Sequence, residues 1–280
     1  MKKFSIFLTG FFLLLTLKIT TLDHPLVVMA DMSQQEVLES YAQAIASHPD
    51  DAQLYHNRAH FKERVGDYQG ALQDYDKVVQ LDPNNAVPYN NRGNVKFKLD
   101  DYQGALADYT QAILLQPKYM AAYNNRGNVK KRIGDYQGAL ADYTYAIKFA
   151  SNPAEVYDNR GLLKEDLKDY QGALDDYNKA IASNPALFLA YYHRANMKLA
   201  LRDVKGALED YNTTIALYPT YGKAYYNRAI IYAVLRDKPK AFADIKKAKQ
   251  LFHASNDTEN YQSVLELEKK MIADLGEEAL

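Results

Sequence analysis

Residues 86–119 read AVPYNNRGNVKFKLDDYQGALADYTQAILLQPKY, and close variants of this stretch recur along the chain every 34 residues. The clearest marker is a tyrosine, which returns at Tyr55, Tyr89, Tyr123, Tyr157, Tyr191 and Tyr225. A unit of this length cannot bury its own apolar face, so neighbouring units must stack to form one continuous core. The sequence therefore predicts a solenoid whose function lies on its surface.

Each unit reads as two helices joined by a tight turn. In residues 86–119 a first helical face includes Tyr89 and Gly93, and a second begins at Tyr102 and stops at Pro117, whose ring cannot continue a helix. An aspartate precedes the second helix of every unit, where its carboxylate can accept free backbone N–H groups. The expected N-caps are Asp67, Asp101, Asp135, Asp169, Asp203 and Asp237.

Small residues recur where the two helices must approach closely, because a larger side chain would overpack the contact. With the tyrosines and the proline they form the series Tyr89, Gly93, Ala105, Tyr109, Ala112 and Pro117. This series resembles the tetratricopeptide repeat (TPR) family, and the NNRG and DYQGALADY wording is similar to exported TPR proteins of the cyanobacterial type. The resemblance implies an all-α fold, an α-α superhelix (TPR solenoid) of six helix-turn-helix repeats.

The repeat register divides the chain into nine segments. They are a signal peptide (1–30), an N-terminal capping half-repeat (31–51), six repeats (52–85, 86–119, 120–153, 154–187, 188–221 and 222–255) and a C-terminal capping helix and tail (256–280). The half-repeat reads as a second helix without a first, and residues 256–259 offer the start of the last helix. These two end segments should cover the exposed faces of the terminal repeats.

Two places depart from the repeat pattern. Ser151 stands where other repeats have proline, and Pro153 follows, so the joint between the third and fourth repeats should differ. In the sixth repeat Lys238 and Ile245 replace tyrosines, and we expect the core to become thinner there. Glycines such as Gly104, in the recurring YQGAL, are expected to serve helix packing.

The N-terminal residues differ in kind from the repeats. Two lysines precede an apolar run over residues 4–17, and residues 28–30 are small enough for signal peptidase. The run is shorter than the ~20 apolar residues that span a bilayer. We therefore expect cleavage after Ala30 and export to the periplasm or a comparable envelope compartment, with no stable membrane span. Because the run lies unusually far from Ala30, an uncleaved anchor is the alternative.

Composition narrows the chemistry and the partners. The chain has no cysteine, which excludes disulfides, thiolate metal sites and cysteine nucleophiles. Its net charge is −1, and it becomes −3 without residues 1–30, so the basic surface that nucleic-acid binding needs is lacking. Most of the 24 tyrosines fall in the repeat register, and we expect these to be core residues rather than a stacking platform.

Arginines and aspartates recur sixteen residues apart in every repeat. The arginines are Arg58, Arg92, Arg126, Arg160, Arg194 and Arg228, and the aspartates are Asp74, Asp108, Asp142, Asp176, Asp210 and Asp244. The half-repeat has Ser40 at the aspartate position, so pairing with the preceding repeat would leave Arg58 without a partner. We therefore predict an ion pair inside each repeat, as between Arg126 and Asp142; the alternative is that these charges bind a ligand.

The first helices are expected to form the inner groove of the superhelix, as the TPR resemblance implies. Asparagines follow the recurring tyrosine there, and an amide can both donate to and accept from the backbone of an extended peptide. This arrangement resembles the asparagine ladder of the TPR arm of the O-linked N-acetylglucosamine transferase. The candidate groove residues are Asn57, Asn90, Asn91, Asn94, Lys98, Asn124, Asn125, Asn128, Lys131, Arg132, Asn159, Tyr192, Asn196, Tyr226 and Asn227. The alternative is that the amides bond between neighbouring helices.

The charges in the predicted groove change along its length. Lys98, Lys131 and Arg132 are basic, the fourth repeat is acidic, and the fifth and sixth offer Tyr192 and Tyr226. A ligand with acidic, basic and apolar parts in that order would fit, unless neighbouring charges simply pair across the stack. The lysines that grip chaperone tails in some TPR domains are missing here.

One cluster has the spacing of a metal site. His56, His60 and Glu63 share a helix face, but Asn57 stands where an HExxH pair has its acid, so no metal site is expected. No catalytic triad, phosphate loop or dinucleotide fingerprint is visible, and we expect neither a cofactor nor enzymatic activity.

The sequence thus predicts a non-catalytic scaffold or adaptor that binds an extended peptide or a partner domain in its groove. The alternatives are a self-associating structural protein of the cell envelope and a subunit that presents substrates to a separate enzyme. The identity of the protein or peptide partner is not readable from the sequence.

Overall fold

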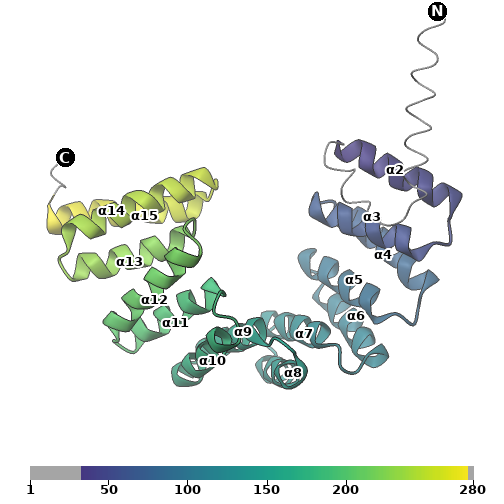
Figure 1. Cartoon of the computed structure of the whole chain (residues 1–280), viewed down its shortest axis with the longest axis horizontal. Helices are drawn as coiled ribbons and strands as arrows, with labels where there is room; N and C mark the ends of the chain where they lie inside the picture. The colour runs from purple at the N-terminus through teal and green to yellow at the C-terminus, as the bar shows by residue number, and fades with distance from the viewer. Residues whose placement is uncertain (1–32, 277–280) are drawn as a thin grey trace, which may run out of the picture. The chain divides into compact units, whose positions relative to one another are not determined.

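The computed structural model describes residues 33–276, so the predicted signal peptide lies outside the described range. Within that range every regular element is an α-helix, from α2 to α15 (Figure 1), which confirms the all-α prediction. The chain forms two compact units that divide between Gln111 and Ala112, inside α6. Each unit is described by itself.

The first unit contains the half-repeat and two helical hairpins. Its helices are α2 (Gln34–Ser47), α3 (Ala52–Arg64), α4 (Tyr68–Leu81), α5 (Ala86–Lys98) and most of α6 (Tyr102–Leu115). The isolated α2 is the predicted second helix without a first. Ser33 starts it with a capping box, in which the Ser33 side chain and the Glu36 carboxylate each bind the other residue's backbone N–H.

The second unit continues with four hairpins and a last helix. Its helices are α7 (Met120–Arg132), α8 (Tyr136–Phe149), α9 (Ala154–Asp166), α10 (Tyr170–Ser183), α11 (Phe188–Ala200), α12 (Val204–Leu217), α13 (Gly222–Val234), α14 (Lys238–Ala254) and α15 (Thr258–Leu275). We call the first helix of each repeat the A helix (α3, α5, α7, α9, α11, α13) and the second the B helix. Within the part of the chain that is described, no helix is long and apolar enough to cross a membrane.

The turn between the A and B helices has the same backbone in every repeat. Its second residue has a positive φ: Gly66 (84°), Asp100 (59°), Gly134 (86°), Lys168 (62°), Arg202 (66°) and Arg236 (61°). The following aspartate caps the B helix as predicted, with Asp135 Oδ1, for example, 2.9 Å from the Gly138 nitrogen. The expectation that glycines such as Gly104 serve helix packing is wrong. A Cβ on Gly104 would collide with the capping carboxylate of Asp101, so the glycine leaves room for the cap.

The A and B helices of a repeat touch through a small residue and a tyrosine ring. A Cβ on Gly127 would lie 2.7 Å from the Tyr143 ring, and Gly93 and Gly161 face Tyr109 and Tyr177 in the same way. These B-helix tyrosines are fully buried, as predicted. The prediction was wrong for two others in register, because Tyr136 and Tyr170, at the start of their B helices, are about 40% exposed.

The predicted ion pairs are present inside every repeat. Arg126 donates from Nε and Nη2 to the two carboxylate oxygens of Asp142 at 2.9 and 2.7 Å, and the same fork joins each of the other five pairs. Each arginine also lies over the ring of the recurring tyrosine three residues earlier, 5.4–5.7 Å from its centroid. A bidentate guanidinium thus connects the A and B helices of one repeat.

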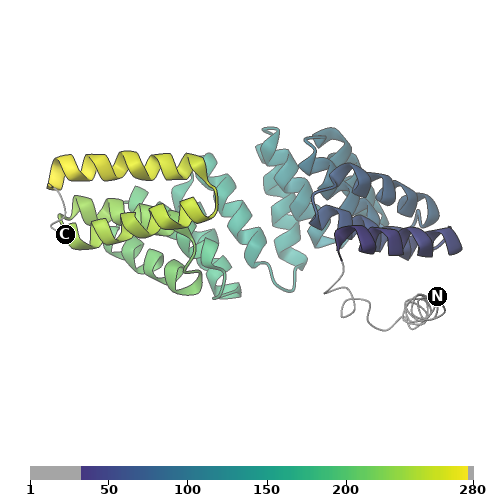
Figure 2. The ribbon, with the colours of Figure 1, turned by 90° about the horizontal axis from the view of Figure 1, so that it is seen from above.

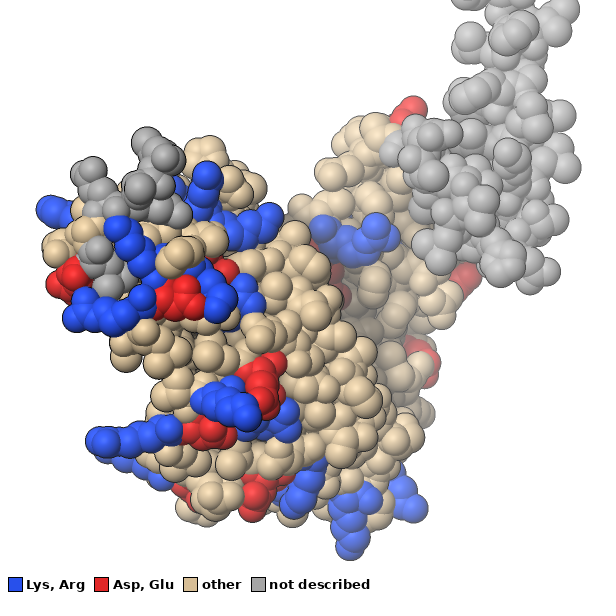
Figure 3. All heavy atoms as spheres, turned by 60° about the vertical axis from the view of Figure 1, so that its left-hand side comes forward, with Lys and Arg blue, Asp and Glu red and all other residues tan. Residues whose placement is uncertain are grey.

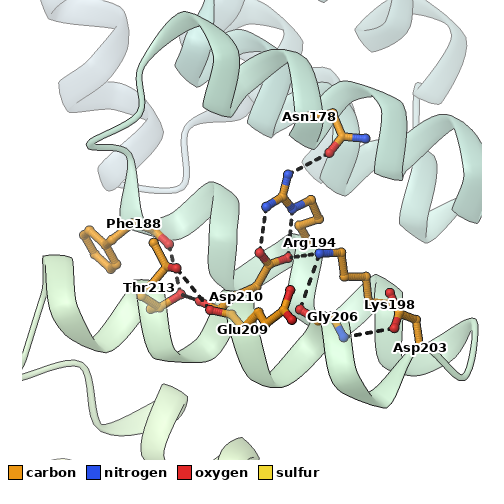
Figure 4. A network of polar contacts seen from close by, with 10 residues as sticks. Asn178, Phe188, Arg194, Lys198, Asp203, Gly206, Glu209, Asp210 and Thr213 are labelled. Carbon is orange, nitrogen blue, oxygen red and sulfur yellow. Dashed lines mark hydrogen bonds and ion pairs between the residues drawn. The ribbon is translucent and has the colours of Figure 1, made fainter.

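Each ion pair has further partners that the sequence analysis missed. The aspartate binds a second cation from the A helix, through Lys62, Lys96, Lys130, Lys164 and Lys198 at 2.8–2.9 Å. The third arginine nitrogen reaches back to the preceding B helix, as Figure 4 shows for Arg194 and Asn178 at 2.8 Å. Arg92, Arg160 and Arg228 donate in the same way to Asp76, Thr144 and Asn212. The arginine therefore binds both its own repeat and the one before it.

The last hairpin and α15 enclose the largest buried cluster in the described chain. Figures 1 and 2 show α15 beside α14, and Phe242, Ile245, Phe252, Val264 and Met271 are buried together there. The predicted capping helix is confirmed, with Asp257 as its N-cap. The expectation of a thinner core is wrong, because phenylalanines and α15 fill the space.

The joint between the third and fourth repeats differs as predicted. α8 ends at Phe149, and the C-cap residue Ala150 has a φ of −72° and a ψ of 137°, unlike the C-cap residues of α4, α10 and α12. Pro153 then precedes α9 without a side-chain cap, and the Asn152 side chain accepts from the Ala154 nitrogen instead.

Candidate functional site

In each of the two units, the residues that follow the recurring tyrosine lie in two rows along the A helices, and we call these residues the A-helix face. The first row consists of His56, Asn90, Asn124, Asp158, Tyr192 and Tyr226, and the second of Asn57, Asn91, Asn125, Asn159, His193 and Asn227. Of these side chains Asn90 and Asp158 are buried, at 4% and 6% exposure, and the others are partly exposed. The face is therefore polar and half-buried.

In the second unit the two rows bond to each other between consecutive repeats. Asn159 Nδ2 donates to Asn124 Oδ1 at 3.0 Å, His193 Nδ1 lies 2.9 Å from Asp158 Oδ1, and Asn227 Nδ2 donates to the Tyr192 hydroxyl at 3.2 Å. Each second-row side chain thus binds the first-row side chain of the repeat before it. These contacts show that the side chains bond between neighbouring A helices, which is the alternative given above to peptide binding by the amides.

These bonds use only half of each amide. The Asn124 nitrogen and the Asn159 oxygen have no hydrogen-bond partner among the described residues. No buried side-chain nitrogen or oxygen in residues 33–276 lacks a partner, so these two amide atoms reach solvent. The Asn227 oxygen is in the same position. The A-helix face therefore presents a donor at Asn124 and acceptors at Asn159 and Asn227, each held in orientation by its neighbour.

A third row of asparagines binds the core tyrosines. Asn94, Asn128 and Asn196 accept from the hydroxyls of Tyr109, Tyr143 and Tyr211 at 2.5–2.7 Å. Where this asparagine is missing, a glutamate one turn later takes its place: Glu63 accepts from Tyr75 at 2.7 Å and Glu165 from Tyr177 at 3.1 Å. Burial raises the pKa of all five tyrosines, so the hydroxyls remain protonated donors.

In the first unit Asn57 and Asn90 each form a hydrogen bond within their own helix. Asn57 accepts from Gln53 at 2.7 Å on the same helix, and Asn90 donates to Asn91 at 3.2 Å. His56 packs edge-on against the Tyr75 ring, with 5.7 Å between centroids. The structure thus places Asn57, Asn90 and Asn91 along their A helices, and Asn125 lies in the corresponding row of α7.

Two of the predicted groove cations pair with acids of a neighbouring repeat. Lys131 Nζ lies 2.9 Å from Asp166, and Lys98 Nζ lies 3.7 Å from Glu63 and over the Tyr68 ring. These two lysines therefore pair with acids of a neighbouring repeat. This is the alternative to the prediction that they bind the acidic part of a ligand. Arg132 is exposed in the last turn of α7.

Aromatic rings surround the predicted Tyr192. Its ring lies 5.1 Å from Tyr221 and 5.6 Å from His193, and Phe188 stacks on Tyr218 at 4.5 Å nearby. Burial, Tyr192 and Asp158 raise the pKa of Tyr221 to about 12. Tyr226 packs against the last core cluster. The A-helix face changes from amides to aromatic rings between α7 and α13.

Glu63 of the suspected metal cluster has other partners. It accepts from the Tyr75 hydroxyl and faces Lys98, and within residues 33–276 no group of His, Cys, Asp or Glu has the arrangement of a metal site. The signal for these contacts was present in the sequence, because Glu63 and Glu165 stand one turn after His60 and Leu162, which replace the asparagine in two of the repeats that keep the core tyrosine.

Family models match most of the repeat region. Tetratricopeptide repeat models match residues 40–73, 86–119 and three overlapping stretches (125–188, 159–221 and 192–255), and a TPR repeat model matches residues 65–100. The chain belongs to the tetratricopeptide repeat family. TPR proteins bind protein or peptide partners, so the chain is built as a protein-interaction scaffold. No curated protein matches the sequence of this TPR chain.

Solved TPR structures share the fold. A tetratricopeptide repeat protein from Parabacteroides merdae is 20% identical, with a TM-score of 0.66, and the match covers 83% of this chain and 92% of the other. MamA from Desulfovibrio magneticus is 24% identical, with a TM-score of 0.52 over 61% of this chain and 96% of the other. YrrB, described as a TPR protein with an unusual peptide-binding site, is 22% identical, with a TM-score of 0.50 over 68% and 98%.

Proposed function

We propose that the protein is a non-catalytic adaptor that holds an extended peptide on its A-helix face. The observation that carries the proposal is the divided use of the amides: one half of Asn124 and Asn159 binds the neighbouring repeat, and the other half reaches solvent. A side chain fixed in this way loses little rotational freedom when a ligand binds. Its exposed donor and acceptor suit the C=O and N–H groups that every peptide backbone carries.

The aromatic part of the face supports a preference in the ligand. Tyr192 and Tyr221 offer rings and hydroxyls beside the Asp158–His193 contact, whereas α7 and α9 offer amides. A peptide that lies along these helices would have its backbone bound at the amides and an apolar or aromatic side chain at Tyr192. YrrB, with its described peptide-binding site, provides a precedent in the same fold.

The experiment is selection from a random peptide library, followed by affinity measurement with one selected peptide. Asn124→Asp is the informative variant, because Oδ1 still accepts from Asn159 while the exposed donor becomes an acceptor. One lost hydrogen bond, with an added charge opposite a peptide carbonyl, should weaken binding by about 1.5–3 kcal/mol, roughly 10- to 100-fold.

Asn178→Asp is the matched control. Asn178 lies on a B helix and also uses its oxygen as an acceptor, from Arg194, so the same substitution changes charge without touching the A-helix face. Unchanged affinity in Asn178→Asp and loss in Asn124→Asp is the expected pair. Equal affinities in the two variants, or a library that yields no binder, would remove the A-helix face as the peptide site.

We also infer that this scaffold acts outside the cytoplasm. Support comes from the two lysines, the apolar run and the small residues of positions 1–30, together with the absence of cysteine from the sequence. N-terminal sequencing of the protein from an envelope fraction tests it, with Asp31 expected as the first residue. An intact Met1 in that fraction would favour the uncleaved anchor.

A further inference from the structure

The A–B turn of the sixth repeat departs from the other five. The last residue of its A helix is Val234, where the other repeats have Arg64, Lys98, Arg132, Asp166 and Ala200. The B helix then begins with Lys238 in place of the tyrosine or valine of the other repeats, and Lys240 replaces the glycine of the cap. The turn thus has a large apolar residue where four other repeats have a charged one and the fifth has alanine, and its B helix begins with additional lysines.

This turn exposes its apolar side chains. Val234 is 76% exposed, the highest value among the large apolar side chains of the described residues, and the adjacent Leu235 is 53% exposed. Neither belongs to the core cluster that fills the rest of the sixth repeat. Full burial of such a side chain is worth about 1.5–3 kcal/mol, so a folded chain that leaves both in water loses that stabilisation.

Basic residues are frequent in the repeat that carries the exposed pair. Residues 222–255 contain eight lysines and arginines but only two aspartates, whereas the whole chain has a net charge of −1. Figure 3 shows lysine and arginine side chains on this part of the surface, with acidic side chains among them. Carboxylates pair with Arg228, Lys240 and Lys249, whereas Lys246 and Lys247 are exposed on α14 without a carboxylate within 4 Å.

The end of α15 lies against the same turn. Arg236 Nη1 donates to the Asp274 carbonyl oxygen at 3.1 Å, and Figures 1 and 2 both place the end of α15 beside the α13–α14 turn. The last helix therefore contacts the turn through Arg236, the residue that follows Leu235.

We propose that the α13–α14 turn, with Val234 and Leu235 at its tip and lysines around it, binds the surface of an anionic lipid bilayer. Apolar side chains that enter the interface and cations that remain at the headgroups are the two components of peripheral membrane binding. An acidic protein surface could pair with the lysines, but its polar groups would then lie against the apolar side chains of Val234 and Leu235. The lipid surface accounts for both components.

Because the chain has no cysteine, a single introduced thiol can carry a fluorescent probe that reports membrane contact at a chosen position. Val234→Cys creates a single thiol for an environment-sensitive fluorophore, and Leu114→Cys gives a matched control, because Leu114 on α6 is 69% exposed but has no basic residue within three positions. Vesicles of phosphatidylglycerol and phosphatidylcholine should shift the emission at position 234 to the blue and raise it severalfold. Pure phosphatidylcholine vesicles, and the probe at position 114, should give little change.

Charge reversal supplies the second measurement. Lys246→Glu/Lys247→Glu, in the Val234→Cys background, should weaken partitioning into anionic vesicles roughly 25-fold or more, at about fivefold for each lysine lost. Far-UV circular dichroism before labelling checks that each variant is folded. An unchanged probe at position 234 with anionic vesicles, an equal response at positions 114 and 234, or an equal response to polyglutamate without vesicles would overturn the proposal.

Discussion

The arginines of the Arg–Asp pairs and the residues of the A-helix face lie on the same helices, one or two positions apart, yet they differ in how strictly they repeat. Every repeat has the arginine, the aspartate and the tyrosine beneath the guanidinium, whereas the first row of the face contains histidine, asparagine, aspartate and tyrosine. The fork binds the B helix and the preceding repeat, so its geometry admits no substitute. The residues of the A-helix face do not join the A and B helices of a repeat, so they can differ between repeats without changing the fold.

The sixth repeat should show the largest effect of removing an arginine of the Arg–Asp pairs. Arg228 and Asp244 form its pair without a lysine, because Tyr232 stands at the lysine position. Arg228→Leu leaves the buried Asp244 without a cation and should lower the free energy of unfolding by about 3–5 kcal/mol. Arg126→Leu should cost less, since Lys130 remains 2.8 Å from Asp142. Chemical denaturation measures both, and equal losses would contradict a role for the lysine.

The acceptors of the core tyrosines sharpen the comparison. Tyr177→Phe leaves the Glu165 carboxylate without its hydroxyl donor and should cost about 1.5–3 kcal/mol, whereas Tyr143→Phe loses a neutral bond to Asn128 and should cost about 1 kcal/mol. Thermal melts of the two variants test the order. The reverse order would show that Glu165 is already satisfied by solvent.

The turns allow a smaller, purely local test. A Cβ on Gly134 meets nothing within 4 Å, so Gly134→Ala should cost about 1 kcal/mol through the backbone alone. Lys168→Gly removes the same strain and should gain about 0.5 kcal/mol. The two variants should shift the denaturation midpoint in opposite directions, and a loss of stability in both would contradict the strain argument.

His56 gives the smallest expected effect. Burial lowers its pKa below the ordinary value of 6.5; His60 adds to this shift and Glu63 opposes it. The unfolded chain therefore takes up a proton here at a higher pH than the folded chain, so stability falls as the pH drops below 6.5. Melts between pH 7.5 and 5 should show a weaker slope in His56→Phe. An identical slope would assign the dependence to other groups.

The period made most of the fold predictable from the sequence. Helix positions, N-caps and ion pairs follow from comparing six copies, and the Ser40 position alone decided that Arg126 pairs within its repeat. The row from Lys62 to Lys198 was equally visible at the same spacing, but its role was missed, because a spacing does not say which of two cations reaches a carboxylate. The exposure of Tyr136 depends on how the next repeat packs, which no single unit specifies.

The candidate site was less accessible to sequence reasoning. An asparagine in register can bond along its helix, as Asn57 does, or across to the preceding repeat, as Asn159 does, and the spacing in the sequence is the same in both cases. Their part in binding a peptide stays a prediction. The pairing of Lys131 with Asp166 shows the same limit, because opposite charges 35 residues apart in the sequence are neighbours only once the repeats stack.

The bonds from Arg92, Arg160, Arg194 and Arg228 to the preceding B helix couple each of these repeats to the repeat before it. A repeat that loses its predecessor also loses a hydrogen bond of its own fork, so melting should spread from repeat to repeat rather than stay local. The coupling is not equal everywhere: Arg160 bonds a threonine hydroxyl at 3.1 Å, whereas Arg194 and Arg228 bond amides at 2.8 and 2.5 Å. That weaker contact coincides with the irregular joint at residues 150–153. Unfolding that spreads through the second unit should therefore pause between the third and fourth repeats.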